Sequence, residues 1–229
     1  MEGVLHGFGG VLAENAPHLI EQAPNWAPMA HLGRGHFQQL RGAPSLAREE
    51  FERCVRLSDP REVQSFPVLL AFCPGAAAYV ECLIELGQAD LAKSWGEGAL
   101  ATLRTLNVDA PTWELERAVA LAEGKLQAYD PATARLQRLI AAQRELGVRG
   151  LHLGASYEAR TRIAIWAGDK PAIAEYGRLT ALEYHHGASS PLAARYERLL
   201  EEAERAGVMS LRRSDTSSLV RTPSEPWRE

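Results

Sequence analysis

The sequence predicts an all-α fold, an α-solenoid of antiparallel helix hairpins, and three observations lead to this prediction. Pairs of small residues recur seven positions apart in helical segments, and seven residues are two helical turns, so both members share one face. A turn containing glycine or proline precedes each pair, in residues 41–44, 86–88, 128–131 and 167–171. The first members of the pairs are 45, 42 and 40 residues apart, a repeat length typical of helical solenoids. The pairs are Ala47 with Cys54, Ala92 with Ala99, Ala134 with Ala141, and Ala174 with Ala181.

The first expected elements are a helix over residues 11–22, a break at residues 23–28 and a hairpin over residues 29–41 and 45–57. Pro44 followed by Ser45 favours a helix start, and Pro60 ends the hairpin. Residues 60–73 contain Pro60 and Pro67 and lead into Pro74. They therefore predict a connector with one short turn of helix.

Three further hairpins are expected over residues 74–86 with 89–106, 111–127 with 131–146, and 151–167 with 170–186. Pro74 suits the first position of its helix, and Asp130 before Pro131 predicts an N-cap. Gly168 and Asp169 form the turn of the last hairpin.

A last helix is expected over residues 191–206, apolar on one side and charged on the other. Such a polar outer face is what a helix that caps a solenoid needs, and Gly207 closes it. The polar residues after it predict a flexible tail. The expected organisation is therefore an N-terminal helix and linker over residues 1–28, a repeat array over residues 29–207 and a tail over residues 208–229.

Composition argues against some partners and some cellular compartments. The chain has 229 residues and a formal net charge of −4, which argues against a nucleic-acid-binding surface. No run approaches 18 apolar residues, so no membrane span is expected, and the first residues lack a signal-peptide pattern. The odd count of three cysteines, Cys54, Cys73 and Cys82, predicts a reduced cytoplasmic protein with buried thiols.

Several segments resemble tetratricopeptide (TPR) repeats. Ala47 with Phe51 four positions later, after Gly42, matches the second half of that motif, whereas Gly96, Arg138 and Arg178 stand where the aromatic residue is expected in the other hairpins. The segments 73–92, 157–168 and 193–206 are similar to the TPR regions of large bacterial signalling ATPases, class III adenylate cyclases and multidomain serine/threonine kinases. In those proteins the catalytic modules lie outside the array. The resemblance therefore implies a fragment whose catalytic module lies upstream in the same polypeptide, or a stand-alone relative.

No signature of an enzyme is present in the sequence. The phosphate-binding loop G-x-x-x-x-G-K-[ST], H-E-x-x-H, C-x-x-C, G-x-S-x-G and the kinase motifs are all missing. His31 and His36 are five residues apart and fit one helix face poorly, and His185 and His186 are adjacent, so no metal or cofactor site is expected. Trp95 is expected in the core between hairpins.

The TPR resemblance further implies that one face of the first helix of each hairpin lines a concave groove. The matching positions are His36, Gln39, Glu81, Glu85, Glu116, Glu123, Glu158, Arg162 and Trp166. Five of these are glutamates, so the groove would favour a basic or amine-bearing segment of another protein. The alternative is a solvated helix face that happens to be acidic.

These observations together predict a protein-interaction or regulatory scaffold module of a bacterial signalling system, and not an enzyme. One alternative is a domain that senses a small-molecule effector and regulates a linked NTPase or kinase. Another is a structural subunit of a larger assembly. A roomy pocket lined by aromatic and a few polar side chains would favour the sensor, whereas an apolar convex patch would favour the subunit.

Overall fold

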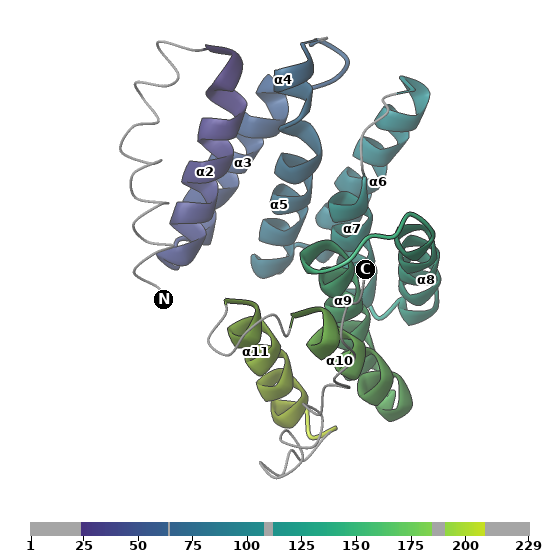
Figure 1. The fold of residues 1–229 in the computed structure, drawn as a ribbon. Coiled ribbons are helices and arrows are strands. Elements are labelled where there is room, and N and C mark those ends of the chain that lie inside the picture. Colours follow the sequence, from purple (N-terminus) through teal and green to yellow (C-terminus); the bar gives the residue numbers. More distant parts are fainter. Residues whose placement is uncertain (1–23, 64, 108–111, 185–190, 209–229) are drawn as a thin grey trace, which may run out of the picture. The chain divides into compact units, whose positions relative to one another are not determined.

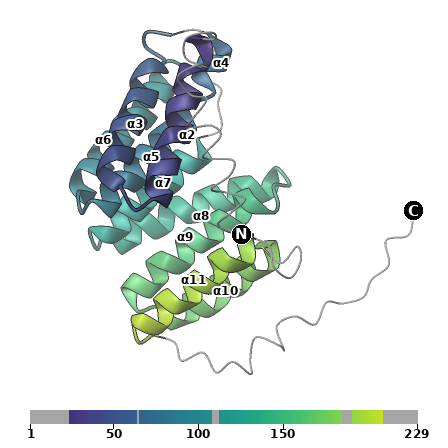
Figure 2. The same ribbon diagram turned by 90° about the vertical axis from the view of Figure 1, so that its left-hand side faces the viewer.

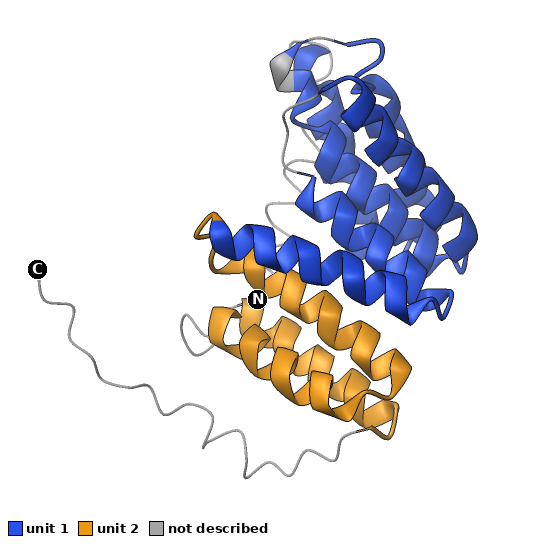
Figure 3. Ribbon diagram, turned by 90° about the vertical axis from the view of Figure 1, so that its right-hand side faces the viewer, with its two compact units in different colours: residues 1–145 blue, residues 146–229 orange. Residues whose placement is uncertain are grey.

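The structure, a computed structural model, describes residues 24–63, 65–107, 112–184 and 191–208. All regular elements in these ranges are helices, which confirms the all-α class (Figure 1). The expected helix at residues 11–22, residues His185 and His186, and most of the expected tail lie outside the described residues. The chain divides into two compact units, residues 1–145 and 146–229 (Figure 3).

Unit 1 consists of three helix hairpins whose helices pack side by side (Figures 1 and 2). After a 3₁₀ turn at Pro24–Trp26, the hairpins are α2 (Ala27–Leu40) with α3 (Pro44–Leu57), α5 (Phe72–Glu85) with α6 (Ala89–Thr105), and α7 (Trp113–Lys125) with α8 (Tyr129–Glu145). Each first helix also packs on the second helix of the preceding hairpin, α5 on α3 and α7 on α6. The four-residue helix α4 (Phe66–Leu69) lies in the connector where one helical turn was expected.

Unit 2 consists of one hairpin and a closing helix. The hairpin is α9 (Leu151–Ala167) with α10 (Lys170–Tyr184), and α11 (Pro191–Arg205) packs on both. Leu199 and Ala203 of α11 are buried in an apolar cluster with Ile165 and Ile173, whereas Glu201 and other charged residues of α11 are exposed. This arrangement agrees with the capping helix that the sequence predicts.

Every hairpin turn uses the same hydrogen bonds. One residue with a positive φ ends the first helix, and the next N–H donates to the carbonyl five residues earlier, as Ala43 does to Gln38 at 3.0 Å. This is the Schellman arrangement, which favours glycine because it lacks a Cβ. The turn residues are Gly42, Gly87, Gln127 and Gly168. They give repeat steps of 45, 40 and 41 residues.

The turn hydrogen bonds correct two of the four small-residue pairs. Ala47, Cys54, Ala92 and Ala99 are buried, as expected. In the third hairpin Ala134 is half-buried and Ala141 is exposed, and in the fourth Ala174 is exposed. The residues that lie five positions after the turn in these hairpins are Ala132 and Ile173, and both are buried. The prediction placed these helices one or two residues out of register because it matched alanines and not turns.

Helices pack closely where the sequence has glycine or alanine. A Cβ on Gly96 of α6 would lie 2.5 Å from Val119 of α7, and one on Gly35 of α2 would lie 2.3 Å from Phe51 of α3. Both distances are too short for any larger residue unless the neighbouring side chain or its helix shifts. Gly96 therefore replaces the expected aromatic side chain because α7 occupies its space.

Two expected helix starts differ from the structure. Ala132 N–H donates to Ala128 at 3.2 Å, so α8 begins before Asp130 and the N-cap prediction is wrong. The helix α5 begins at Phe72, which places Pro74 third in the helix. Proline is tolerated there because the first four N–H groups of a helix lack intrahelical partners.

Candidate functional site

Four of the expected groove residues lie together on α2 and α5. Gln39 Nε2 donates a hydrogen bond to Glu85 Oε2 at 3.2 Å, and His36 Nδ1 lies 3.2 Å from Gln39 Oε1. His36 and Glu85 are exposed, and Glu81 is half-buried on the same face of α5, one turn before Glu85. We call His36, Gln39, Glu81 and Glu85 the α2–α5 face. Glu81 and Glu85 form no ion pair among the described residues.

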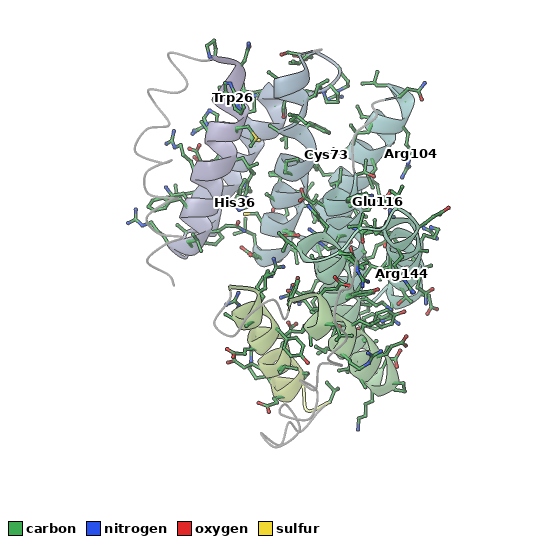
Figure 4. All side chains as sticks on the ribbon, in the orientation of Figure 1. Trp26, His36, Cys73, Arg104, Glu116 and Arg144 are labelled. Atoms are coloured by element: carbon green, nitrogen blue, oxygen red, sulfur yellow. The ribbon has the colours of Figure 1, made fainter. Side chains whose placement is uncertain are left out.

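The structure places Glu116 and Glu123 of α7 elsewhere, around a guanidinium group from α8. Arg135 Nη1 donates to Glu116 Oε2 at 2.6 Å, Arg135 Nη2 donates to Glu123 Oε1 at 3.1 Å, and Arg135 also pairs with Glu97 of α6. Arg104 of α6 lies 3.6 Å from Glu116 as well, and Figure 4 shows the two residues on their helices. The two glutamates therefore face the second helices α6 and α8 and not the α2–α5 face.

The pairing around Arg135 occupies carboxylates that the sequence suggested as a free acidic surface. Glu123 is only 3% exposed. Burial alone lowers the pKa of Arg135, but hydrogen bonds and attraction from Glu123 and Glu116 outweigh it and raise that pKa above its usual value. Arg135 thus stays charged and holds three helices together.

In unit 2, Glu158, Arg162 and Trp166 come together in a second network. Glu158 is 1% exposed; it accepts a hydrogen bond from Tyr184 of α10 at 2.6 Å and lies 2.8 Å from the guanidinium groups of Arg162 and Arg195. Arg162 Nε and Trp166 Nε1 donate to Glu202 of α11 at 3.2 and 2.9 Å. These side chains tie the closing helix α11 to α9 and α10.

Counting back from the turn residues shows which of the expected groove residues occupy equivalent positions in their hairpins. His36, Glu81 and Arg162 each lie six residues before their turn residue, and Glu85 and Trp166 each lie two before it. The same two positions in α7 hold Leu121 and Lys125, whereas Glu116, Glu123 and Glu158 lie at other positions. Because the third turn has Gln127 in place of glycine, the sequence offered no marker for this register.

Sequence reasoning missed a pocket in unit 1 between α3 and α6, over the start of α5. Its volume is about 460 Å³. Trp95, which was expected in the core, lines the pocket; it is half-buried and packs edge-on against Tyr79 with ring centroids 4.8 Å apart. The lining residues are Glu52, Val55, Arg56, Asp59, Arg61, Phe72, Trp95, Gly98, Ala99 and Thr102.

The pocket carries two charges of each sign, and two of the four are paired with each other. Arg61 Nε donates to Asp59 Oδ1 at 2.9 Å. The hydrogen bond from Arg61 lowers the pKa of Asp59 below its usual value, so this pair is ionised at neutral pH. Glu52 and Arg56 lie one helical turn apart on α3, and neither forms an ion pair with any described residue.

Histidines and cysteines show no cluster suited to a metal ion within the described ranges. His31 Nδ1 lies 2.7 Å from Glu50 Oε2, which also pairs with Arg53. Cys54, Cys73 and Cys82 are unbridged and buried, as the sequence predicts. No helix in the described part of the chain is both long and apolar enough to cross a membrane.

Comparison with known proteins supports the fold. No family model matches the chain, and neither does any curated protein. Among solved structures, the chain is similar to the crystal structure of BtubC (BKLC) from P. vanneervenii, with a TM-score of 0.60 and 12% sequence identity over 100% of this chain and 96% of that one. At this identity the likeness shows a shared helical architecture and nothing about function.

Proposed function

We propose that this chain is a protein-interaction module that binds a segment of a partner protein along the α2–α5 face. The observation that supports this most directly is the Gln39–Glu85 hydrogen bond, which joins the exposed faces of two successive hairpins. A partner segment lying across it would contact both hairpins at once. Helical repeat proteins commonly bind partners on such extended faces.

The charges of this face favour a basic partner segment. Glu81 and Glu85 carry the carboxylates of the expected groove that form no ion pair with any described residue, whereas Glu116, Glu123 and Glu158 pair with arginines within the fold. Partly exposed carboxylates attract a cationic segment mainly through the association rate, and salt screens the attraction. The resemblance to bacterial signalling proteins suggests that the module is non-enzymatic and cytoplasmic and regulates such a system, with a catalytic module of the same polypeptide as one further candidate partner.

Charge reversal on the α2–α5 face tests this proposal. The full chain and the double variant Glu81→Lys/Glu85→Lys are used to capture proteins from cells of the source, with quantification by mass spectrometry. We expect the partner to be lost from the variant and its capture by the unchanged chain to weaken as salt rises, because both effects follow from lost attraction.

The matched control is Glu201→Lys/Glu204→Lys, which reverses two exposed glutamates on α11 of unit 2. It should capture the partner as the unchanged chain does. Equal capture by all three proteins would show that the α2–α5 face does not bind.

A second candidate function is the binding of a small-molecule effector, and the pocket between α3 and α6 favours it. A volume of about 460 Å³ falls within the range of sites for small ligands. Its lining combines aromatic and aliphatic side chains with a few charged groups, the composition that typifies such sites.

A further inference from the structure

The space between α3 and α6 has a filled counterpart one repeat later, between α6 and α8. Arg135 lies eight residues after its turn residue and pairs with Glu97, which lies ten after its own. The same two positions one repeat earlier are Trp95 and Glu52. Glu52 therefore occupies the position of Glu97. In the next repeat Arg135 supplies the cation for Glu97, whereas Trp95 stands at the position of Arg135 beside Glu52.

The helix that lies between the two second helices also differs between the repeats: α5 lacks the carboxylates that α7 provides. Glu116 and Glu123 of α7 lie eleven and four residues before the turn, and their equivalents in α5 are Ala76 and Leu83, both fully buried. The apolar α5 thus offers no carboxylate to hold a buried guanidinium group, and no side chain of the described residues fills the pocket. This gap remains open at its Glu52 edge; of its two carboxylates, Asp59 pairs with Arg61, whereas Glu52 forms no ion pair with any described residue.

Gly98 on the wall of this pocket has no structural explanation within the fold. It lies in the interior of α6, where glycine weakens a helix relative to alanine. A Cβ at this position would meet nothing within 4 Å, in contrast to Gly96, whose Cβ would clash with Val119. A glycine on a pocket wall lets an occupant approach the helix backbone closely.

The two unpaired charges define the chemistry of that occupant. Glu52 and Arg56 lie four residues apart on α3, and side chains at this spacing are neighbours on one helix face. Glu52 suits an ammonium group, Arg56 suits a carboxylate, and Phe72, Trp95 and Val55 offer apolar surface beside them. A ligand that carries an ammonium group and a carboxylate on the same carbon atom satisfies both charges and leaves none unpaired.

We propose that the pocket between α3 and α6 binds a free α-amino acid with an apolar or aromatic side chain. The inference rests on the second candidate function, effector binding, and names its ligand class. The ammonium group pairs with Glu52, the carboxylate pairs with Arg56, and the side chain packs on Trp95 and Phe72. The site is separate from the α2–α5 face.

Calorimetric titration of the full chain with L-phenylalanine and L-leucine tests the proposal, with 3-phenylpropionate and phenethylamine as analogues that each lack one charge. We expect saturable binding of at least one amino acid. Each analogue should bind at least about tenfold more weakly than that amino acid, because a charge-assisted hydrogen bond is lost in each. Glu52→Gln and Arg56→Gln should each weaken binding of the amino acid by a similar factor. Both residues are exposed, so the fold is retained.

Gly98→Leu should abolish binding by filling the pocket. Ala101→Leu, on the same helix but outside the lining, should bind as the unchanged chain does. The absence of saturable binding by both L-phenylalanine and L-leucine would overturn the proposal, and so would binding that survives Gly98→Leu. If an analogue with one charge binds as tightly as the amino acid, the claim that the pocket recognises both charges is wrong, and only the proposal of an effector site remains. None of these outcomes alters capture of a partner on the α2–α5 face.

Discussion

At the scale of single residues, the buried charges of this protein serve to join helices. Arg135 contacts side chains of α6 and α7, and Glu158 contacts side chains of α10 and α11. Glu123 occupies the position that Leu83 holds in the preceding hairpin, so a charged pair replaces an apolar contact at one step of the repeat. Such a pair contributes little net stability when complete, but it is costly to break.

Replacing Arg135 by methionine should destabilise unit 1 by about 3–5 kcal/mol, because Glu123 is left buried without its cation. Urea unfolding followed by circular dichroism measures this change. The double variant Arg135→Met/Glu123→Leu should recover part of the loss, since leucine is the residue found at this position in α5. If the double variant is as unstable as the single one, or the single variant is as stable as the unchanged chain, the pairing does not hold the helices.

The three thiols should make the protein less stable at alkaline pH. Burial raises the pKa of Cys54 to about 12, and the pKa values of Cys73 and Cys82 to about 11, from an ordinary value of 9.0. Between pH 9 and about 11 the unfolded chain ionises these thiols while the folded chain keeps them protonated, so the free energy of unfolding falls as pH rises. Urea midpoints measured from pH 8 to 11 should decrease.

Cys54→Ala is the control for this pH dependence, and its midpoint should decrease less steeply over the same range. A midpoint that does not change with pH, or an equal slope in the variant, would show that the thiols are not protected from ionisation.

At the scale of elements, the hairpin boundaries follow closely from local signals, whereas the register of individual helices does not. The helix over 151–167 agrees with α9 at both ends, because Gly168 marks its end with a positive φ. At the third turn Gln127 takes the same conformation, with a φ of 61°. No sequence rule assigns this conformation to glutamine. The turn residue was therefore not recognised, and the register of the helices on either side of it could not be counted from it.

The corrected register predicts which alanines tolerate a larger side chain. Ala92→Leu and Ala132→Leu should each cost about 1–3 kcal/mol by overpacking, since both residues are fully buried. Ala174→Leu should change stability by less than about 0.5 kcal/mol because Ala174 is exposed. Urea midpoints of the three variants decide the matter. A loss with Ala174→Leu as large as that with Ala132→Leu would contradict the turn-based register.

The candidate sites show the same limit. The resemblance to helical repeats was enough to bring His36, Gln39, Glu81 and Glu85 to one face. It could not place Glu116 and Glu123, because their partner Arg135 comes from a helix beyond the next turn. The pocket escaped prediction because it depends on side chains that leave space unfilled, and Trp95 is as typical of a core as of a pocket wall.

At the scale of the whole molecule, the all-α class is confirmed, and the likeness to BtubC shows that this architecture is compatible with very different sequences. The reason is physical: each hairpin needs small residues where helices approach, a turn residue that tolerates positive φ and apolar residues between layers. These requirements leave the exposed positions free to vary. Under our proposal, partner binding uses exposed positions of this kind, those of the α2–α5 face.

The most direct test of the central claim is site-specific photo-cross-linking in cells of the source. A photoreactive amino acid is placed at position 85 on the α2–α5 face or at position 204 on α11, and adducts are identified by mass spectrometry. The account predicts an adduct to one protein from position 85, with the contacted peptide rich in lysine or arginine, and none from position 204. An adduct from position 204 alone, or none from either position, would contradict the claim that the α2–α5 face is where this chain binds its partner.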